Sequence, residues 1–212
     1  MDDLEAVYGQ PRFVSRFEPM DELVSCILSQ HTSDATSFPT FHALRKRVPE
    51  WEDVVALGPE RLADIIRPAG LANQKARSII AVLREIESRN GAYDIEVLRD
   101  LPLEEARAWL LSLPGVGPKT AAIVLCFAFG RPAIPVDTHV FRVSWRLGLI
   151  EKTIGEAKAH SALEAMVPSE LAFRFHTALI QHGRQICKAP TPICSRCPLT
   201  RRCRYYKLLR AK

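Results

Sequence analysis

The sequence predicts an all-α protein built as two helical lobes. Apolar residues recur three and four positions apart along most of the 212 residues, and no stretch alternates apolar and polar residues as a half-buried strand does. The connections between the helical stretches are short, and no tandem repeat is present. About ten helices joined in this way are typical of a two-lobed helical bundle.

Prolines and glycines mark the first helices in chain order. "PMDELVSCILSQ" has Pro19 in a first-turn position, and "GPERLADIIRP" has Pro59 there and stops at Pro68. "NQKARSIIAVLREIESRNG" is expected to run from an N-cap at Asn73 to Gly91 as the C-terminal stop. Five further helices are expected within residues 102–113, 118–130, 137–148, 154–166 and 169–183.

Composition and charge limit the class of protein. The longest apolar run, residues 121–129, is about half of the roughly 18 residues that a membrane span needs, so no membrane segment is expected. The acidic start "MDDLEAVYGQ" does not resemble an export signal, which favours a reducing, cytoplasmic setting. From Leu171 onward there are ten Lys and Arg and no Asp or Glu, while residues 1–170 carry a net charge of −5. A basic end of this kind suits a polyanion such as nucleic acid, although a solvated basic tail is an equal alternative.

Four of the six cysteines form a cluster near the C-terminal end. Cys187, Cys194, Cys197 and Cys203 have the spacing C-x6-C-x2-C-x5-C. Four thiolates within 17 residues can close one tetrahedral sulfur site, which leaves zinc and a [4Fe–4S] cluster both open. Cys26 and Cys126 lie in apolar helical stretches and are expected to be inert core residues.

The stretch "LPGVGPKTA" predicts a tight turn that opens a helix. Gly115 and Gly117 allow backbone N–H groups to point at one spot, and the following helix N-terminus adds positive potential, so a phosphate would fit there. Lys119 near that helix end is disfavoured as an ammonium ion and becomes a candidate nucleophile. A plain helical corner with a surface lysine is the alternative.

Asp137 in "IPVDTHVFR" lies 18 residues further on, at the start of the next helix, and could return toward Lys119 across a helical hairpin. An ordinary N-cap, contributing about 1 kcal/mol, is the competing explanation. The lysine, the aspartate and the cysteine cluster are harder to explain together than singly.

"LPGVGPKTA", "VDTHVFR" and the cysteine spacing resemble the endonuclease III family of helix-hairpin-helix DNA glycosylases, from about Met20 to Cys203. The resemblance implies a six-helix barrel-like domain over residues 20–130, with the hairpin at about 108–125. It also implies a discontinuous four-helix iron–sulfur domain over residues 1–19 and 131–212, with DNA in the cleft between the two. The cysteine site then becomes a [4Fe–4S] cluster with Cys187, Cys194, Cys197 and Cys203 as ligands.

The resemblance also implies the reaction. A base-excision-repair enzyme of this type flips an oxidised pyrimidine out of damaged double-stranded DNA, and Lys119 attacks the sugar C1′ to form a Schiff base. Asp137 stabilises the developing charge, and β-elimination nicks the strand, so the enzyme is both glycosylase and abasic-site lyase. Adenine-specific mismatch relatives usually have Ser in place of the lysine. A single flipped base requires only a monomer.

The residues that would contact DNA follow from the same resemblance. The hairpin Gly115-Val116-Gly117 would hold a phosphate, and Leu71 in "GLANQKA" matches the residue that wedges into the duplex. The polar gap-filling residue is either His31, in the position where the family has Gln, or the adjacent Gln30. The remaining candidates are His139 in "VDTHVFR" and Lys188 in the loop before Cys194.

Two rival functions remain at this point. One is a glycosylase of the same fold that acts on uracil or mismatched thymine. The other is a cluster-bearing protein that binds lesions and has little activity.

Overall fold

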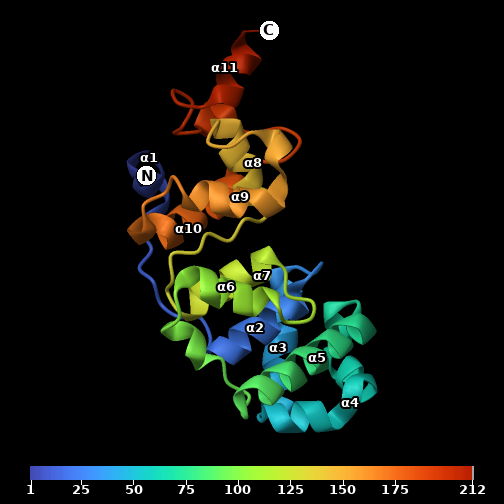
Figure 1. Cartoon of the computed structure of the whole chain (residues 1–212). Helices are drawn as coiled ribbons and strands as arrows, with labels where there is room; N and C mark the ends of the chain where they lie inside the picture. The colour runs from blue at the N-terminus through green and yellow to red at the C-terminus, as the bar shows by residue number, and fades with distance from the viewer. Residues whose placement is uncertain (212) are drawn as a thin grey trace. The chain divides into compact units, whose positions relative to one another are not determined.

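The computed structural model describes residues 1–211, and in that range all regular secondary structure is helical, as predicted (Figure 1). Residue 212, the last of the predicted iron–sulfur domain, lies outside the described residues. The chain divides into two compact units. We call Ser15–Phe129 the central unit, and Met1–Val14 together with the chain from Gly130 onward the discontinuous unit. The sequence prediction puts the first boundary at residue 20 rather than residue 15.

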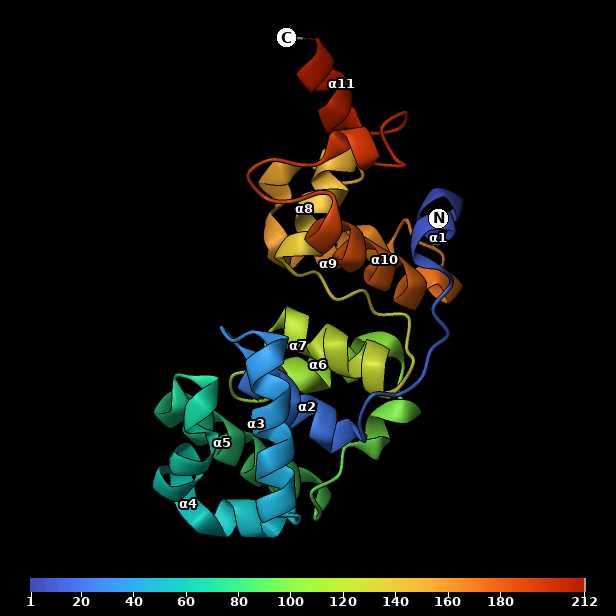
Figure 2. The ribbon, with the colours of Figure 1, turned by 180° about the vertical axis from the view of Figure 1, so that it is seen from behind.

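The central unit contains six α-helices within the described residues. They are α2 (Pro19–Ser29), α3 (Asp34–Arg47), α4 (Trp51–Ile66), α5 (Ala72–Asn90), α6 (Leu103–Leu111) and α7 (Pro118–Ile123). Short 3-10 turns lie at η1 (Arg67–Ala69) and η2 (Glu96–Arg99). α4 and α5 pack side by side as a helical hairpin, and α2 lies against α3, α5 and α7 (Figures 1 and 2). Fully buried apolar side chains from α2, α3, α4 and α5 form the core, among them Leu23, Leu44, Leu62 and Leu83.

The predicted helix starts and stops in this unit are mostly confirmed. Pro19 is the first residue of α2, and Gly91 closes α5 in the left-handed conformation at φ 71°. α4 is interrupted at Gly58, with φ 74°, and restarts at Pro59. The predicted Asn73 cap is wrong, because α5 begins at Ala72 and its N-cap is Leu71, which makes no side-chain capping hydrogen bond.

α3 was not apparent from the sequence. It contains Pro39 and has little apolar periodicity, two features that argue against a helix. The helix is stabilised instead by tertiary packing, since Phe41 and Leu44 are buried where α3 meets α2. Three basic residues in its last turn complement the helix dipole.

α7 continues directly into a π-helical segment, η3 (Val124–Ala128). Together they span the single helix that the sequence predicts over residues 118–130. π-helical segments occur frequently at functional sites. Here the segment buries Cys126 completely, as predicted.

The discontinuous unit contains five α-helices within the described residues. They are α1 (Asp2–Tyr8), α8 (Thr138–Leu147), α9 (Gly155–Glu164), α10 (Ala172–Gln185) and α11 (Arg204–Arg210). Short 3-10 turns lie at η4 (Lys152–Ile154), η5 (Ser169–Leu171) and η6 (Cys194–Arg196). The core draws on α1, α8, α9 and α10 and on Leu199 beside η6.

Close packing of α8 on α10 requires a glycine. A Cβ atom added at Gly183 would lie 2.9 Å from Cβ of His139, which is too close for any side chain. α1 joins the same unit from the other end of the sequence, since Glu5 forms an ion pair with Arg174 of α10. Within residues 1–211, no helix combines the length and the apolar character that a membrane crossing requires.

Candidate functional site

The sequence predicts that the turn between α6 and α7 depends on glycine. The structure shows this dependence at one of its two glycines. Gly115 has φ 76°, a left-handed conformation that favours glycine. Gly117 has φ −99°, which any residue can adopt, and it serves as the N-cap of α7. A Cβ atom at Gly117 would meet nothing within 4 Å, so the space in front of this residue is open.

Val116 anchors the turn rather than facing solvent. Its side chain is 6% exposed, and its N–H donates to the carbonyl of Leu113 at 3.2 Å. Two more hydrogen bonds fix the turn from outside. The side-chain amide of Gln30 donates to the carbonyl of Gly115 at 3.3 Å, and the Arg89 guanidinium donates to the Ser112 hydroxyl at 2.7 Å.

Lys119 is exposed and is the second residue of α7. Its charge reaches Cys26 on α2. Burial and then the Glu22 carboxylate raise the pKa of the Cys26 thiol well above its usual value, and the Lys119 ammonium opposes that rise. The lysine side chain therefore lies near the C-terminal half of α2.

The two loops predicted to enter DNA share an unusual backbone conformation. His31, with φ 56°, and Leu71, with φ 50°, are the two non-glycine residues with positive φ among residues 1–211. Both side chains are exposed, that of Leu71 by 55%. Such conformations cost of order 1 kcal/mol each and cluster at functional sites. Gln30, by contrast, is half-buried and bonded to Gly115.

A buried lysine lies beneath both loops. Lys75 is 3% exposed, and its ammonium group donates three hydrogen bonds. The acceptors are the Leu28 carbonyl at 2.6 Å, the Thr32 hydroxyl at 2.7 Å and the Ala69 carbonyl at 2.7 Å. Burial lowers the pKa of Lys75 from its usual value.

In the discontinuous unit, Asp137 is the N-cap of α8. Its Oδ1 accepts a hydrogen bond from the N–H of Val140 at 2.7 Å, so the capping interpretation is confirmed. Lys119 lies in the central unit and Asp137 in the discontinuous unit, and their pairing stays a prediction.

His139 is half-buried on α8 and shares a 3.0 Å hydrogen bond with Arg142. Arg142 also donates to the carbonyls of Gly183 and Cys187, each at 2.9 Å. His139 thus belongs to a network that joins α8 to the end of α10 and the first cysteine. The side chain of Lys188, next to that cysteine, is exposed.

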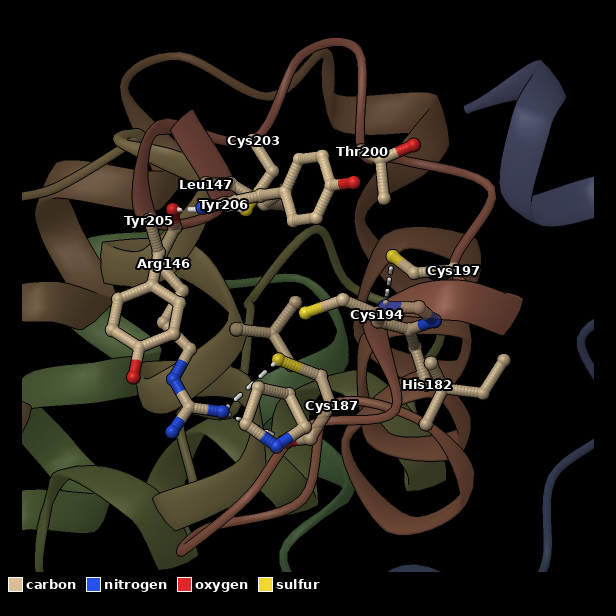
Figure 3. A pocket seen from close by; sticks show the side chains of 13 residues that line it. Arg146, Leu147, His182, Cys187, Cys194, Cys197, Thr200, Cys203, Tyr205 and Tyr206 are labelled. Atoms are coloured by element: carbon tan, nitrogen blue, oxygen red, sulfur yellow. Dashed lines mark hydrogen bonds between the residues drawn. The ribbon is translucent and has the colours of Figure 1, made fainter. Parts of the chain in front are cut away.

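The four clustered cysteines line one cavity, and their sulfur atoms point into it (Figure 3). Among the other residues that line it are Arg146, His182, Tyr205 and Tyr206. Loop residues supply Cys187 and Cys203, and η6 supplies Cys194 and leads into Cys197. The spacing thus brings the four thiols together as the sequence predicts.

N–H groups surround these sulfur atoms. The backbone N–H of Tyr206 donates to Sγ of Cys203, and Arg146 donates to Sγ of Cys187, each at 3.4 Å. Arg146 is 4% exposed and also donates to the carbonyls of Lys188 and Ala189 at 2.8 Å. A cation and amide donors of this kind stabilise thiolate ligands.

His182 contacts another of the four thiols, that of Cys197. Its Nε2 lies 3.5 Å from Sγ of Cys197, and its Nδ1 lies 3.0 Å from the Tyr8 hydroxyl. Burial lowers the pKa of His182 to about 4, so the ring is neutral at pH 7. A neutral ring that accepts from Tyr8 at Nδ1 carries its proton on Nε2 and donates it toward the sulfur.

The arrangement of the thiols bears on which metal group they fit. A tetrahedral zinc site holds each pair of sulfurs about 3.8 Å apart, given a Zn–S bond of about 2.3 Å. Within residues 1–211, no three His, Cys, Asp or Glu side chains converge tightly enough to hold a single metal ion. The four thiols line one cavity, and soft thiolate donors suit both zinc and an iron–sulfur cluster, so the donor set fits either group.

Comparison with known proteins identifies the family. The model of the HhH-GPD superfamily of base excision DNA repair proteins matches residues 24–169, a range that includes both Lys119 and Asp137. The chain belongs to this superfamily.

Within the HhH-GPD superfamily, the chain is similar to endonuclease III. It is 34% identical over 203 residues to endonuclease III of Thermotoga maritima, covering 96% of this chain and 91% of that protein. A candidate DNA glycosylase of Arabidopsis thaliana is 36% identical over 178 residues, and the chain spans only 58% of its length.

Solved structures agree with the sequence relatives. The structure of a non-covalent endonuclease III–DNA complex matches with a TM-score of 0.84 and 32% identity, covering 100% of this chain and 95% of that one. A thermostable thymine-DNA glycosylase matches with a TM-score of 0.80 and 25% identity, covering 98% of this chain and 94% of that one. As an HhH-GPD protein similar to endonuclease III, the chain is a DNA glycosylase of base excision repair.

The sequence analysis missed several polar residues of this HhH-GPD protein that support the loops of the central unit or the thiols of the discontinuous unit. Lys75, Arg142, Arg146 and His182 are buried or half-buried polar groups that hold the loops and thiols. A signal existed for two of them. Lys75 and Arg146 fall on the apolar face of their helices, one turn from Ile79 and Val143, and a charged residue at such a position indicates a specific partner.

Proposed function

We propose that this glycosylase removes oxidised pyrimidines from damaged double-stranded DNA and then nicks the resulting abasic site. Lys119 is the proposed nucleophile, Asp137 its assisting carboxylate, and Cys187, Cys194, Cys197 and Cys203 are proposed to hold a [4Fe–4S] cluster. The observation that carries the proposal is an exposed lysine at the second position of the helix that follows the Gly115–Gly117 turn. The enzyme is proposed to act as a monomer in the cytoplasm.

The neutral amine of Lys119 attacks C1′ of the flipped nucleotide. The C–N bond to the base breaks, and the base leaves with the bonding electron pair. The sugar ring then opens to a Schiff base on Lys119. Removal of a proton from C2′ expels the 3′ phosphate, which nicks the strand and leaves an unsaturated sugar bound to Lys119 as an imine. Water then hydrolyses the imine and frees the lysine.

Asp137 has two proposed roles. Its carboxylate stabilises the positive charge that develops on the sugar as the C–N bond breaks, and it accepts a proton from Lys119. Capping of Val140 by Oδ1 supports these roles, because it fixes the orientation of the carboxylate at the start of α8. His139 and Lys188 are proposed to contact the DNA backbone nearby.

His31 and Leu71 are proposed to occupy the gap left by the flipped base. Both are exposed and project from left-handed backbone positions, whereas Gln30 is bonded to the hairpin. Gln30 would then orient the Gly115–Gly117 turn, whose backbone binds a phosphate, with Val116 as its buried anchor.

The [4Fe–4S] proposal is supported by four thiols that line one cavity and by N–H donors directed at their sulfurs. A bound cluster would cross-link the segment of residues 187–203 at four points, between the end of α10 and the start of α11. The chemistry at Lys119 does not require it.

A second candidate function is excision of mismatched thymine or of uracil, favoured by the structural match to a thymine-DNA glycosylase. Duplexes that contain thymine glycol, 5-hydroxycytosine, uracil or a G·T mismatch separate the two. Preferred release of the oxidised bases supports the first proposal, and preferred release of uracil or mismatched thymine supports the second.

Borohydride trapping on a duplex with one thymine glycol tests the nucleophile. Wild type is expected to give a covalent protein–DNA product, and Lys119→Ala none. Lys46→Ala, at an exposed lysine of the central unit on α3, is the matched control and should trap like wild type. If the wild type binds the duplex and does not trap, the lyase proposal fails, and a monofunctional glycosylase or a lesion-binding protein takes its place.

A further inference from the structure

Lys75 occupies a position where a cation requires special support. A buried ammonium group loses its hydration, and this loss is offset only when each of its three N–H bonds finds an acceptor. All three are satisfied at 2.6 to 2.7 Å. An apolar residue of the same length would fill the space between α5 and α2 without this cost, so the charge itself has a role to explain.

The three acceptors belong to three different segments. Leu28 is in the last turn of α2, where helix carbonyls lack partners within the helix, and Lys75 satisfies its carbonyl with a positive charge at the negative helix end. Thr32 lies in the loop after α2, and Ala69 lies in the turn before α5. The Thr32 hydroxyl also bonds to the Ala69 carbonyl. One side chain therefore ties together the bases of both loops.

Each of these loops carries one strained residue. His31 directly precedes Thr32, and Leu71 lies two residues after Ala69. A left-handed conformation at a non-glycine residue persists only where the surroundings determine it. Gly70, with φ 66°, allows the second loop to turn between the bonded carbonyl and Leu71.

We propose that Lys75 is a positioning residue that holds His31 and Leu71 in fixed relation to each other, as a preformed two-pronged wedge for the DNA duplex. This inference rests on the proposed function for its role in DNA, but the clamp itself is a property of the free protein. The clamp lowers the conformational entropy that the two loops would otherwise lose on binding DNA.

Amide hydrogen exchange on the free protein tests the clamp. Lys75→Met keeps an unbranched side chain and removes all three donors. We expect exchange about tenfold faster in residues 29–33 and 67–72, with little change in residues 113–119 of the same unit. Leu83→Ala, a fully buried position further along α5, is the matched control for general destabilisation and should not single out the two loops.

Thr32→Val tests whether the contacts form one network. It removes the hydroxyl that bonds both Lys75 and Ala69. In a shared network, the double variant Lys75→Met/Thr32→Val loosens the loops less than the sum of the single variants. Thr32→Ser retains the hydroxyl and should restore wild-type exchange. Additive effects, or loops that exchange as in Leu83→Ala, overturn the clamp.

Strand nicking separates the clamp from the reaction. An abasic site in single-stranded DNA has no opposing strand to invade, so Lys75→Met should nick it within about twofold of wild type. On duplex DNA the same variant should lose about tenfold to a hundredfold. Equal losses on both substrates overturn the positioning role. Inactivity of the wild type on both overturns the proposed function, while hydrogen exchange still decides the clamp.

Discussion

Gln30 and His31, adjacent residues at the end of α2, have different environments, and this difference favours His31 as the proposed gap-filling residue. The Gln30 amide is committed to the Gly115 carbonyl, whereas His31 is exposed at φ 56°. The sequence predicts both as candidates, because neighbours in a loop cannot be told apart without the backbone angle. In the structure the His31 side chain is exposed, while the Gln30 amide is held against the hairpin.

Alanine substitutions at these two residues should therefore lower base release to different extents. We expect His31→Ala to lower base release from duplex DNA about tenfold, since the gap beside the flipped nucleotide goes unfilled. Gln30→Ala should lower it only about twofold to threefold, because it removes one neutral hydrogen bond. Single-turnover excision of thymine glycol measures both. A larger loss for Gln30→Ala would make Gln30 the gap-filling residue.

At the scale of elements, the hairpin contains two glycines with different requirements. Gly115 needs its left-handed angle, and Gly117 needs only open space before its N–H. A sequence shows two glycines and cannot assign these roles. It does predict the turn itself, as well as α2, α5 and α8, because their apolar spacing is helical and Pro19, Gly91 and Asp137 mark helix ends that the structure confirms. It misses α3, where packing against α2 overrides Pro39 and weak periodicity.

Alanine substitutions should separate the two glycines. Gly115→Ala forces a side chain into a left-handed angle and should lower the free energy of unfolding by about 1 kcal/mol. Gly117→Ala should leave stability within about 0.5 kcal/mol and weaken DNA binding, because its methyl group stands where a phosphate would approach. Urea denaturation and fluorescence anisotropy with a lesion duplex measure the two effects. Equal stability losses would contradict the assignment.

At the scale of the whole molecule, the thiol cavity and the hairpin lie in separate units, so each can be examined alone. The cysteine spacing predicts the thiol site well, since four cysteines within 17 residues are close enough along the chain to come together in space. The supporting Arg146 and His182 come from α8 and α10, and such long-range partners are not visible in a sequence without contacts. The chain's three tryptophans also divide between the units, with Trp145 beside Tyr205 on the cavity wall.

Loss of the proposed cluster should lower the stability of the discontinuous unit only. In a Trp51→Phe/Trp109→Phe background, Cys197→Ser should abolish visible absorbance and bound iron and shift Trp145 emission. The discontinuous unit should then lose roughly 2 kcal/mol or more of its unfolding free energy. A reciprocal background that keeps only Trp51 is the control and should unfold as before. A colourless wild type that contains zinc would contradict the cluster assignment.

Because one unit is built from both ends of the chain, the two units can complete folding at different times during synthesis on the ribosome. The central unit is continuous in sequence, whereas α1 pairs with Arg174, His182 and Arg202, which all follow residue 170. Domains generally fold as units while synthesis proceeds from the N-terminus. The central unit can therefore complete its core soon after Phe129 emerges, while the first fourteen residues remain unpaired. The nascent chain can therefore have the loops of His31 and Leu71 and the proposed nucleophile, Lys119, in place before the last thiol has been synthesised.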